Sequence, residues 1–261
     1  MWKYLQVEQE PTLSNDPLLL ISISTANPQF VILYSQAREL ANFLLEKVEF
    51  KKFASFYSSA LPAAISVSKS GVADLVGVHL YHARSKSRDI VLLAGYGSPA
   101  SDEYEFGSEI LSFAKKLGVN EVVSIGARWN EEPLPPLEDP KVLGFSTDEE
   151  GAKWLEKNGV TLLKSEAAYY FANTVVGMAP VFGLRGSKLS VNHGEPRPHP
   201  RSLIAFLEVL KKKLDMPIDT STLESKASEL AEVIRTSGYE SASIGETGSA
   251  GGETKQEDIY R

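Results

Sequence analysis

The chain has 261 residues, of which 43% are hydrophobic and 23% are charged, enough to bury the core of one large α/β domain or of two small ones. Its net charge of −7 argues against nucleic acid as the main partner, because phosphate binding requires a basic surface. The sequence has no cysteine, no signal peptide and no apolar run near the ~18 residues that cross a membrane, so we expect a soluble, cytoplasmic protein without disulfides or thiolate chemistry.

The first part of the chain predicts a central strand, a helix and an antiparallel ribbon. The apolar run Leu18–Ile23 predicts a buried strand, and Ser35 is the expected N-cap of a helix that reaches about Val48. Three further strands are predicted at Phe53–Tyr57, Ala64–Val67 and Val76–His82. We expect these three to form an antiparallel ribbon beside a parallel core.

The stretch Asp89–Trp129 predicts a strand, a glycine-rich turn, a helix and a second strand. Its first strand is a continuous apolar run, which is typical of a strand buried on both faces of a parallel sheet. Ser101 or Asp102 can cap the following helix, and Gly118 ends it. Glu121–Ile125 is the return strand, so we expect a right-handed βαβ crossover.

The rest of the chain continues to alternate strands and helices. Thr147 is expected to begin a helix, with Glu150 completing a capping box. The other predicted elements are strands at Val142–Phe145 and Val160–Leu163, a buried helix at Ala167–Met178, a helix at Arg201–Leu214 and a last helix capped by Thr220. This pattern predicts one α/β domain over residues 1–237, with a mainly parallel sheet core flanked by helices and a small antiparallel ribbon.

The Gly95–Asp102 loop is the first place to consider for a ligand. It follows a buried strand and precedes a helix, where α/β proteins often bind anions. It matches neither of the phosphate-binding patterns GxxxxGK[ST] and GxGxxG, and a glycine at such a turn also has a structural reason. Two interpretations stay open: a structural turn, and the ligand site of a nucleoside phosphorylase- or hydrolase-like enzyme.

The histidines do not predict a metal site. His79 and His82 lie three apart on a predicted strand, so they point to opposite faces. His193, Glu195 and His199 share a proline-containing loop and could reach one metal ion, but we favour a surface loop without a metal. No serine stands in a GxSxG motif. We therefore predict no catalytic residue, no cofactor and no metal.

Residues 238–261 form a segment of different composition, rich in Gly, Ser, Thr and Glu, which is typical of a flexible tail. The segment ends in Ile259, Tyr260 and Arg261, where an apolar and an aromatic side chain stand beside a terminal carboxylate. A random end to a polar tail is the simpler interpretation. A flexible tail of about 21 residues nevertheless spans roughly 25 Å, and tyrosine offers a large contact area at low entropic cost. We therefore take the tripeptide as a candidate docking element.

Proteasome activators and proteasome assembly chaperones have a docking motif at the C-terminus. The motif consists of a hydrophobic residue, then a tyrosine, then any residue. The body of the chain resembles the archaeal branch of the proteasome-assembly-chaperone family. The resemblance rests on the order and spacing of the stretches Asp89–Ala127, Lys141–Val160 and Leu203–Leu230. It implies a phosphorylase/hydrolase-like α/β domain, self-assembly into small oligomers and no catalysis.

The same resemblance implies that Ile259, Tyr260 and Arg261 enter a pocket between adjacent proteasome α-subunits. Ile259 would fill an apolar slot, Tyr260 would pack and form a hydrogen bond, and the Arg261 carboxylate would pair with a lysine. We predict a proteasome assembly chaperone or core-particle activator that is not an enzyme. Its partners would be α-subunits or core-particle precursors, and it would form a homo-oligomer or assemble with a paralogous subunit. It would need neither nucleic acid nor a membrane.

Overall fold

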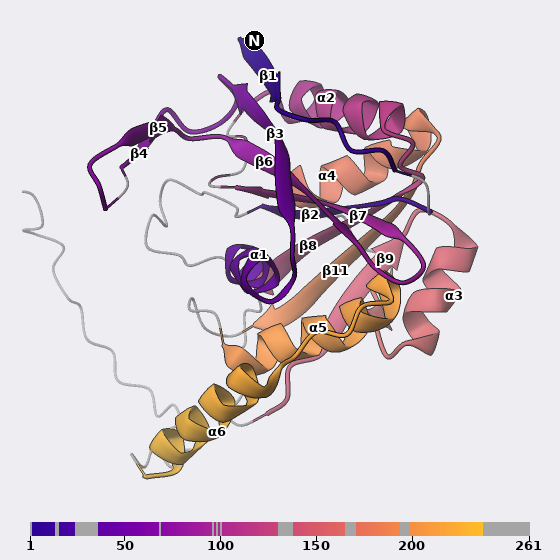
Figure 1. Cartoon of the computed structure of the whole chain (residues 1–261). Helices are drawn as coiled ribbons and strands as arrows, with labels where there is room; N and C mark the ends of the chain where they lie inside the picture. The colour runs from indigo at the N-terminus through magenta and orange to yellow at the C-terminus, as the bar shows by residue number, and fades with distance from the viewer. Residues whose placement is uncertain are drawn as a thin grey trace, which may run out of the picture.

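Figure 1 shows the computed structural model of the chain, which describes residues 2–13, 16–23, 36–67, 69–95, 97, 99, 101–129, 138–164, 171–193 and 199–236. Within these residues, nine strands form one mixed sheet and two more form a separate hairpin. The strands are β1 (Lys3–Val7), β2 (Leu18–Ile23), β3 (Lys51–Ser58), β4 (Ile65–Val67), β5 (Ala73–Leu75), β6 (Val78–Arg84), β7 (Asp89–Gly95), β8 (Glu121–Trp129), β9 (Val142–Ser146), β10 (Thr161–Leu162) and β11 (Arg185–His193). The helices are α1 (Gln36–Lys47), α2 (Glu103–Lys116), α3 (Glu149–Lys157), α4 (Phe171–Met178), a short 3-10 helix (Ala179–Phe182), α5 (Pro200–Leu214) and α6 (Ser221–Thr236).

The sheet has a parallel centre and largely antiparallel flanks. Its strand order is β1-β3-β6-β7-β2-β8-β11-β9-β10. The four central strands β7, β2, β8 and β11 run parallel to one another. On one side β6, β3 and β1 continue the sheet in antiparallel fashion, and on the other β9 is antiparallel to β11 and parallel to β10. The predicted α/β fold is confirmed, and the predicted parallel core corresponds to these four strands.

Strand β2 occupies the middle of the parallel centre. All six of its residues are buried, as its apolar sequence predicted. Leu18 is in register with Ile90 of β7 on one side and with Glu121 of β8 on the other. The predicted strand, helix and strand of Asp89–Trp129 are present as β7, α2 and β8. The two strands of this unit do not pair with each other, because β2 lies between them.

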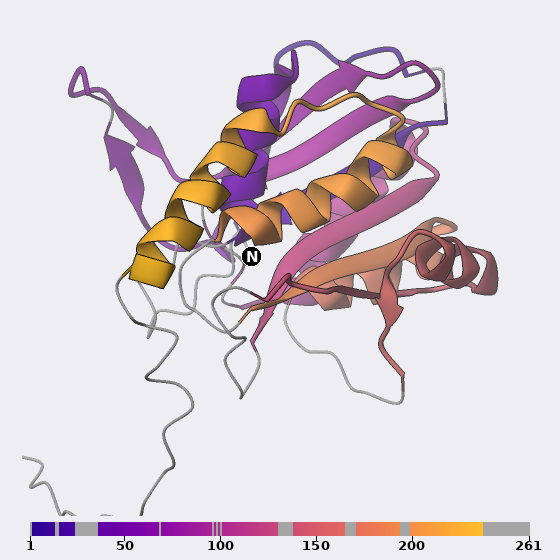
Figure 2. The same ribbon diagram turned by 90° about the horizontal axis from the view of Figure 1, so that it is seen from below.

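Helices cover both faces of the sheet and divide the core into two layers (Figures 1 and 2). Alternate residues of each buried strand point to opposite faces, so Leu18 and Leu20 pack with α1, α3 and α5, whereas Leu19 and Ile21 pack with α2 and α4. Helix α6 packs against α5 and extends beyond the edge of the sheet. Each large apolar side chain buried in this way contributes about 1.5–3 kcal/mol to folding.

The antiparallel ribbon is smaller than predicted. Strands β3 and β6 belong to the main sheet, because the middle of β3, residues 53–56, is buried and contributes Phe53 and Phe56 to the core on the α2 face. The ribbon consists of β4 and β5 alone, in which Ile65 pairs with Leu75 and Val67 with Ala73. The sequence analysis did not predict β5.

Two helix starts differ from the predicted caps. Asp148, and not Thr147, caps α3, since its carboxylate accepts a hydrogen bond from the Gly151 amide at 2.7 Å. Thr147 Oγ1 instead accepts from the Gly186 amide at 2.9 Å and ties α3 to the start of β11. Asp102 stands at the N-cap of α2, but its side chain makes no capping bond. The predictions for Ser35, residues 165–170, Glu195 and residues 238–261 lie outside the described residues.

Candidate functional site

The predicted docking residues Ile259, Tyr260 and Arg261 lie outside the described residues. The last described element is α6, which ends at Thr236, so the structure describes the body up to the segment in which they lie. The features of that body that resemble functional sites are the glycine loop, the histidines, the groove beside α6, the hairpin and the buried charges.

The glycines after β7 have a structural explanation. A Cβ on Gly95 would lie 2.6 Å from the Gly77 carbonyl oxygen and 2.7 Å from Val78 Cα, so only glycine allows β6 and β7 to approach this closely. Gly97 has a φ of +92° and packs against the Pro62 ring, 2.8 Å from where its Cβ would be. Of the two interpretations of the Gly95–Asp102 loop, the described residues favour the structural turn.

The start of α2 is acidic and would repel a phosphate. Asp102, Glu103 and Glu105 place three carboxylates at or within the first turn, where a phosphate-binding helix needs unopposed amide groups. Asp102 has a left-handed backbone with φ of 52°, and its Oδ2 accepts a hydrogen bond from Ser101 Oγ at 3.2 Å. The described part of this loop therefore has the wrong charge for a phosphate site.

Three of the four histidines have structural partners, and the side chain of His193 lies outside the described part of the structure. His79 Nδ1 lies 2.9 Å from Ser55 Oγ, and burial, followed by the charge of Lys52, lowers the pKa of this histidine. His82 Nε2 lies 2.8 Å from the buried Asp89 carboxylate. His199 caps α5 by accepting a hydrogen bond from the amide two residues on. Within the described ranges, no three His, Asp or Glu side chains could hold a metal ion together.

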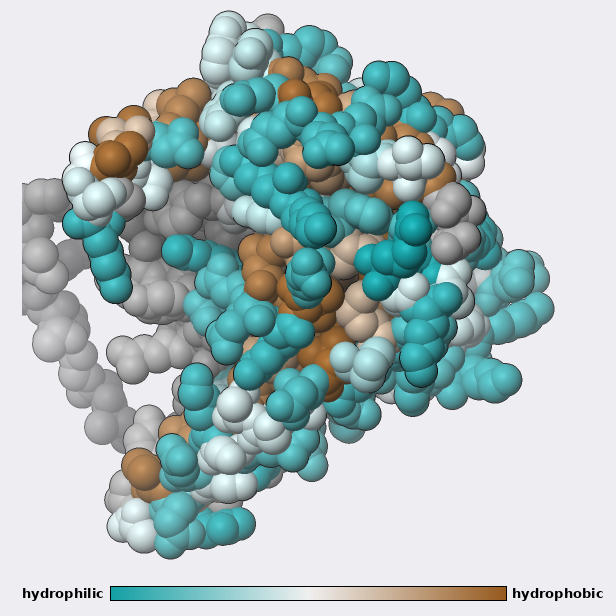
Figure 3. Space-filling view, viewed as in Figure 1, coloured by the Kyte–Doolittle hydropathy of each residue, from teal (hydrophilic) through white to brown (hydrophobic). Residues whose placement is uncertain are grey.

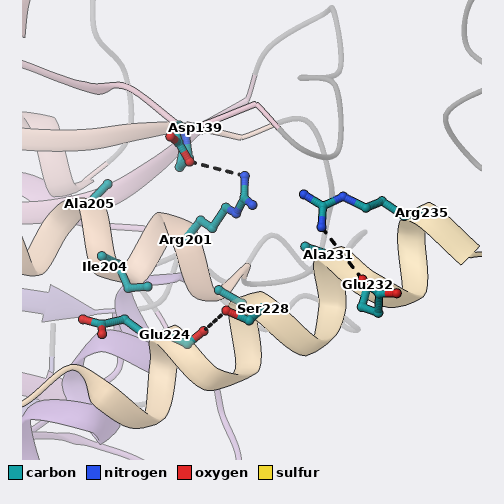
Figure 4. A pocket seen from close by; sticks show the side chains of 11 residues that line it. Asp139, Arg201, Ile204, Ala205, Glu224, Ser228, Ala231, Glu232 and Arg235 are labelled. Carbon is teal, nitrogen blue, oxygen red and sulfur yellow. Dashed lines mark hydrogen bonds and ion pairs between the residues drawn. The ribbon is translucent and has the colours of Figure 1, made fainter.

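A groove of about 670 Å³ lies between the N-terminal half of α5 and the outer half of α6 (Figure 4). Its floor is apolar and consists of Ile204, Ala205, Ala227 and Ala231. Arg201 and Arg235 extend into it from opposite helices, and each pairs with an acidic residue, Asp139 at 3.3 Å and Glu232 at 3.9 Å. With both arginines paired, the groove offers an apolar floor beside the remaining carboxylate of Glu224.

The β4–β5 hairpin carries an exposed apolar face. Residues opposite one another in an antiparallel pair lie on the same face, so Ile65, Val67 and Leu75 share one side of the hairpin with Ala73. The three larger side chains and Val72 at the turn are between 45% and 66% exposed. Figure 3 shows apolar side chains gathered on this projecting arm, at the upper left of the molecule.

A buried ion cluster closes the amino-terminal edge of the parallel strands. Arg88 donates to the Asp16 carboxylate at 2.7 Å and to Glu121 at 3.1 Å. Glu121 also pairs with Lys213, whose Nζ lies 4.4 Å from the centre of the Trp154 ring. These residues join β7, β8, α3 and α5. The cluster lies at the edge opposite to the one where α/β proteins usually bind ligands, and we assign it a structural role.

Lys188 on β11 is a functional candidate that the sequence analysis missed. It is 3% exposed, and burial lowers the pKa of its amine from 10.5 to about 7. A Cβ on Gly126 would lie 2.7 Å from its Nζ, so the amine occupies the space that this glycine leaves open. The available signal was the charged residue within RGSKLSVNH, which occupies a central strand.

The described part of the body is thus a mixed α/β sheet between two helical layers, with structural roles for most of its charges and histidines. The chain belongs to the PAC2 family, which matches residues 37–236. No curated protein matches the sequence. Among the described residues, none of the helices is long and apolar enough to cross a membrane.

Solved structures share this fold at low sequence identity. PbaB from Pyrococcus furiosus, described as an archaeal proteasome activator, has a TM-score of 0.76 and 21% identity, over 90% of this chain and 98% of that chain. PbaA from Pyrococcus furiosus, described as an archaeal homolog of proteasome-assembly chaperone, has a TM-score of 0.68 and 20% identity, over 92% and 93%. A proteasome-assembly chaperone homologue from Mycobacterium tuberculosis has a TM-score of 0.68 and 18% identity, over 84% and 94%.

Proposed function

We propose that this protein binds proteasome α-subunits and acts as an assembly chaperone or core-particle activator in the cytoplasm. The observation that carries the proposal is its membership of the PAC2 family over residues 37–236. The shared fold with PbaA and PbaB, whose descriptions name proteasome assembly and activation, supports the same role. The protein would act by binding, without catalysis.

In this proposal residues 1–237 form the body and residues 238–261 form a flexible tail that carries the contact. Ile259 and Tyr260 supply an apolar and an aromatic anchor, the kind of side chains that dominate small interfaces. They enter a pocket between adjacent α-subunits together with Arg261, whose side chain the motif leaves unconstrained. A tail that begins after α6 would let the body remain outside that pocket.

One short tail binds weakly, so the proposal includes self-assembly of the body or assembly with a paralogous subunit. Several tails on one oligomer raise the effective concentration of each tail at the ring, and avidity can exceed single-site affinity by 10²–10⁴. The gain requires that the spacing of the tails match that of the pockets. The apolar face of the β4–β5 hairpin, formed by Ile65, Val67 and Leu75, is the surface on which we expect two copies to meet, because these large apolar side chains are between 45% and 65% exposed.

A binding experiment with tail variants tests the proposal. The full chain, a chain that ends at residue 258, and Tyr260→Ala would each be immobilised and exposed to α-subunits and to intact core particle. Tyr239→Ala is the matched control, because it removes a tyrosine from the region between α6 and the tripeptide. We expect retention by the full chain and by Tyr239→Ala, and at least a tenfold loss in the other two. Equal retention by the truncated chain would overturn the docking role of the tripeptide.

The two proposed activities are separated by what the protein does after binding. An activator increases peptide hydrolysis by the mature core particle, whereas an assembly chaperone increases the yield of core particle from separate α- and β-subunits. The first is measured with a fluorogenic peptide and the second on native gels. Failure in both assays, with α-subunit binding intact, would exclude both activities.

A further inference from the structure

Two polar side chains lie next to each other inside the sheet on the face covered by α4. Lys188 of β11 is in register with Ser124 of the neighbouring parallel strand β8, so their side chains lie side by side on one face. Two residues further on, Ser190 is in register with Gly126. Because Lys188 Nζ lies over Gly126, the lysine side chain runs toward the carboxyl ends of the two strands.

Neither side chain has a partner in the described part of the chain. Ser124 is fully buried and its Oγ makes no hydrogen bond. Lys188 is 3% exposed, and burial alone lowers the pKa of its amine, with no carboxylate to raise it again. Buried lysines in proteins are normally paired or extend their amine to water, and a buried hydroxyl normally has a hydrogen-bond partner. Two such groups on one face of the sheet are therefore candidates for binding a ligand.

Helix α4, which covers these two residues, would favour an anion, in contrast to the acidic start of α2 on the same face of the sheet. Helix α4 covers this face and has no acidic residue, and its buried side chains there are apolar. Val176 O lies close to Gly186 at the start of β11, which places the C-terminal half of α4 at the amino end of the strand. The N-terminus of α4, the positive end of its dipole, therefore lies toward the carboxyl ends, where Lys188 points.

We propose that Lys188 and Ser124 form a binding site for the anionic group, carboxylate or phosphate, of a small molecule. The ammonium form of Lys188 supplies the charge, and the Ser124 hydroxyl supplies a hydrogen bond. Gly126, which has no side chain, leaves the space that Nζ itself occupies. Ser124 and Lys188 are each the fourth residue of a nine-residue strand, and the lysine side chain extends from there toward the carboxyl ends, where ligands of open α/β sheets bind. This binding site is separate from the proposed proteasome contact and goes beyond it.

A thermal-unfolding experiment on the full chain tests this site with two probes. The melting temperature would be measured in sodium phosphate, sodium acetate and sodium chloride at equal ionic strength and pH 7. We expect phosphate or acetate to raise it relative to chloride by more than it does in Lys188→Met, because these anions also stabilise folded proteins without binding a site, and the anion with the larger excess identifies the preferred group. A melting temperature that is the same in all three salts would overturn the proposal.

Three variants assign any such effect to this site. In Lys188→Met the apparent affinity for the effective anion should fall at least tenfold, while Lys157→Met, which removes an exposed lysine of α3, should leave it unchanged. Gly126→Ala leaves both polar groups in place but puts a methyl group against Nζ, and it should also weaken binding. An equal response of Lys188→Met and the unaltered protein would assign the anion effect elsewhere. Isothermal titration with the same anion checks that changes in folding do not account for the differences.

Discussion

Replacing Lys188 with methionine should stabilise the protein at neutral pH and reduce the dependence of its stability on pH. Methionine is similar in length and has no charge to desolvate, so it fits the buried position. In the folded protein burial lowers the pKa of the Lys188 amine from 10.5 to about 7. Between these values the unfolded chain binds more protons than the folded one, so the free energy of unfolding rises as the pH rises.

The size of the effect follows from that pKa. One pH unit of full difference in protonation changes the free energy of unfolding by about 1.4 kcal/mol. Since the folded amine is half protonated near pH 7, the contribution of Lys188 should increase by about 2 kcal/mol from pH 7 to pH 9. Below pH 7 both states carry the proton and this contribution levels off. Lys188→Met should lack it entirely.

Urea unfolding of both proteins at pH 6, 7, 8 and 9, in buffers without phosphate or carboxylate, measures the difference. Subtracting the two curves removes the contribution of the other titrating groups, and α4, which covers the lysine, has no titratable side chain. The variant should be the more stable protein at pH 7, and its advantage should shrink as the pH rises. If the free energies of unfolding of the two proteins differ by the same amount from pH 7 to pH 9, the pKa of Lys188 is not lowered and its amine is not buried without a partner.

Three further predictions concern the body of the protein. Arg88→Met should lower the free energy of unfolding by about 1.5–3 kcal/mol in urea titrations, because it removes the hydrogen bond to the buried Glu121 carboxylate, which then keeps only Lys213 as its cation; a loss below 1 kcal/mol would contradict the structural role of the cluster. Gly95→Ala should destabilise the fold by about 1–3 kcal/mol, since its Cβ would collide with backbone atoms of neighbouring residues, and an unchanged melting temperature would mean that the close approach is not required. Ile65→Ser with Val67→Ser should lower the mass found by light scattering without loss of folding, whereas Ser66→Ala on the opposite hairpin face should not; an unchanged mass in the double variant would remove the hairpin from the proposed self-assembly.

The elements of the fold could be predicted where the local sequence determines them. Leu18–Ile23 and the strands of Asp89–Trp129 are apolar runs that suit only a buried strand, and the helix between them has apolar residues at helical spacing. The pairing of strands could not be predicted in the same way. Nothing in the local pattern shows that β2 enters between β7 and β8, because that position depends on contacts between residues far apart in the chain.

The site was harder to predict because it depends on register. Lys188 and Ser124 become neighbours only when β11 pairs with β8, and Gly126 makes room for an amine two residues away on the other strand. The N-cap of α3 could not be predicted for the same reason. Both Thr147 and Asp148 can cap a helix, and Asp148 does so because Thr147 bonds to Gly186 on β11. The tripeptide Ile259–Arg261, by contrast, was found from sequence alone, and its docking role stays a prediction.

The central position of β2 has a consequence for how the protein folds during synthesis. Leu20 needs Leu92 on one side and Val123 on the other, so this very apolar strand leaves the ribosome long before either partner exists. Until β8 is complete, β2 exposes unpaired backbone edges of the kind that recruit other chains. We therefore expect the new chain to depend on holding by general folding factors until about residue 129 has emerged, and truncation before that point to produce aggregates and no smaller folded unit.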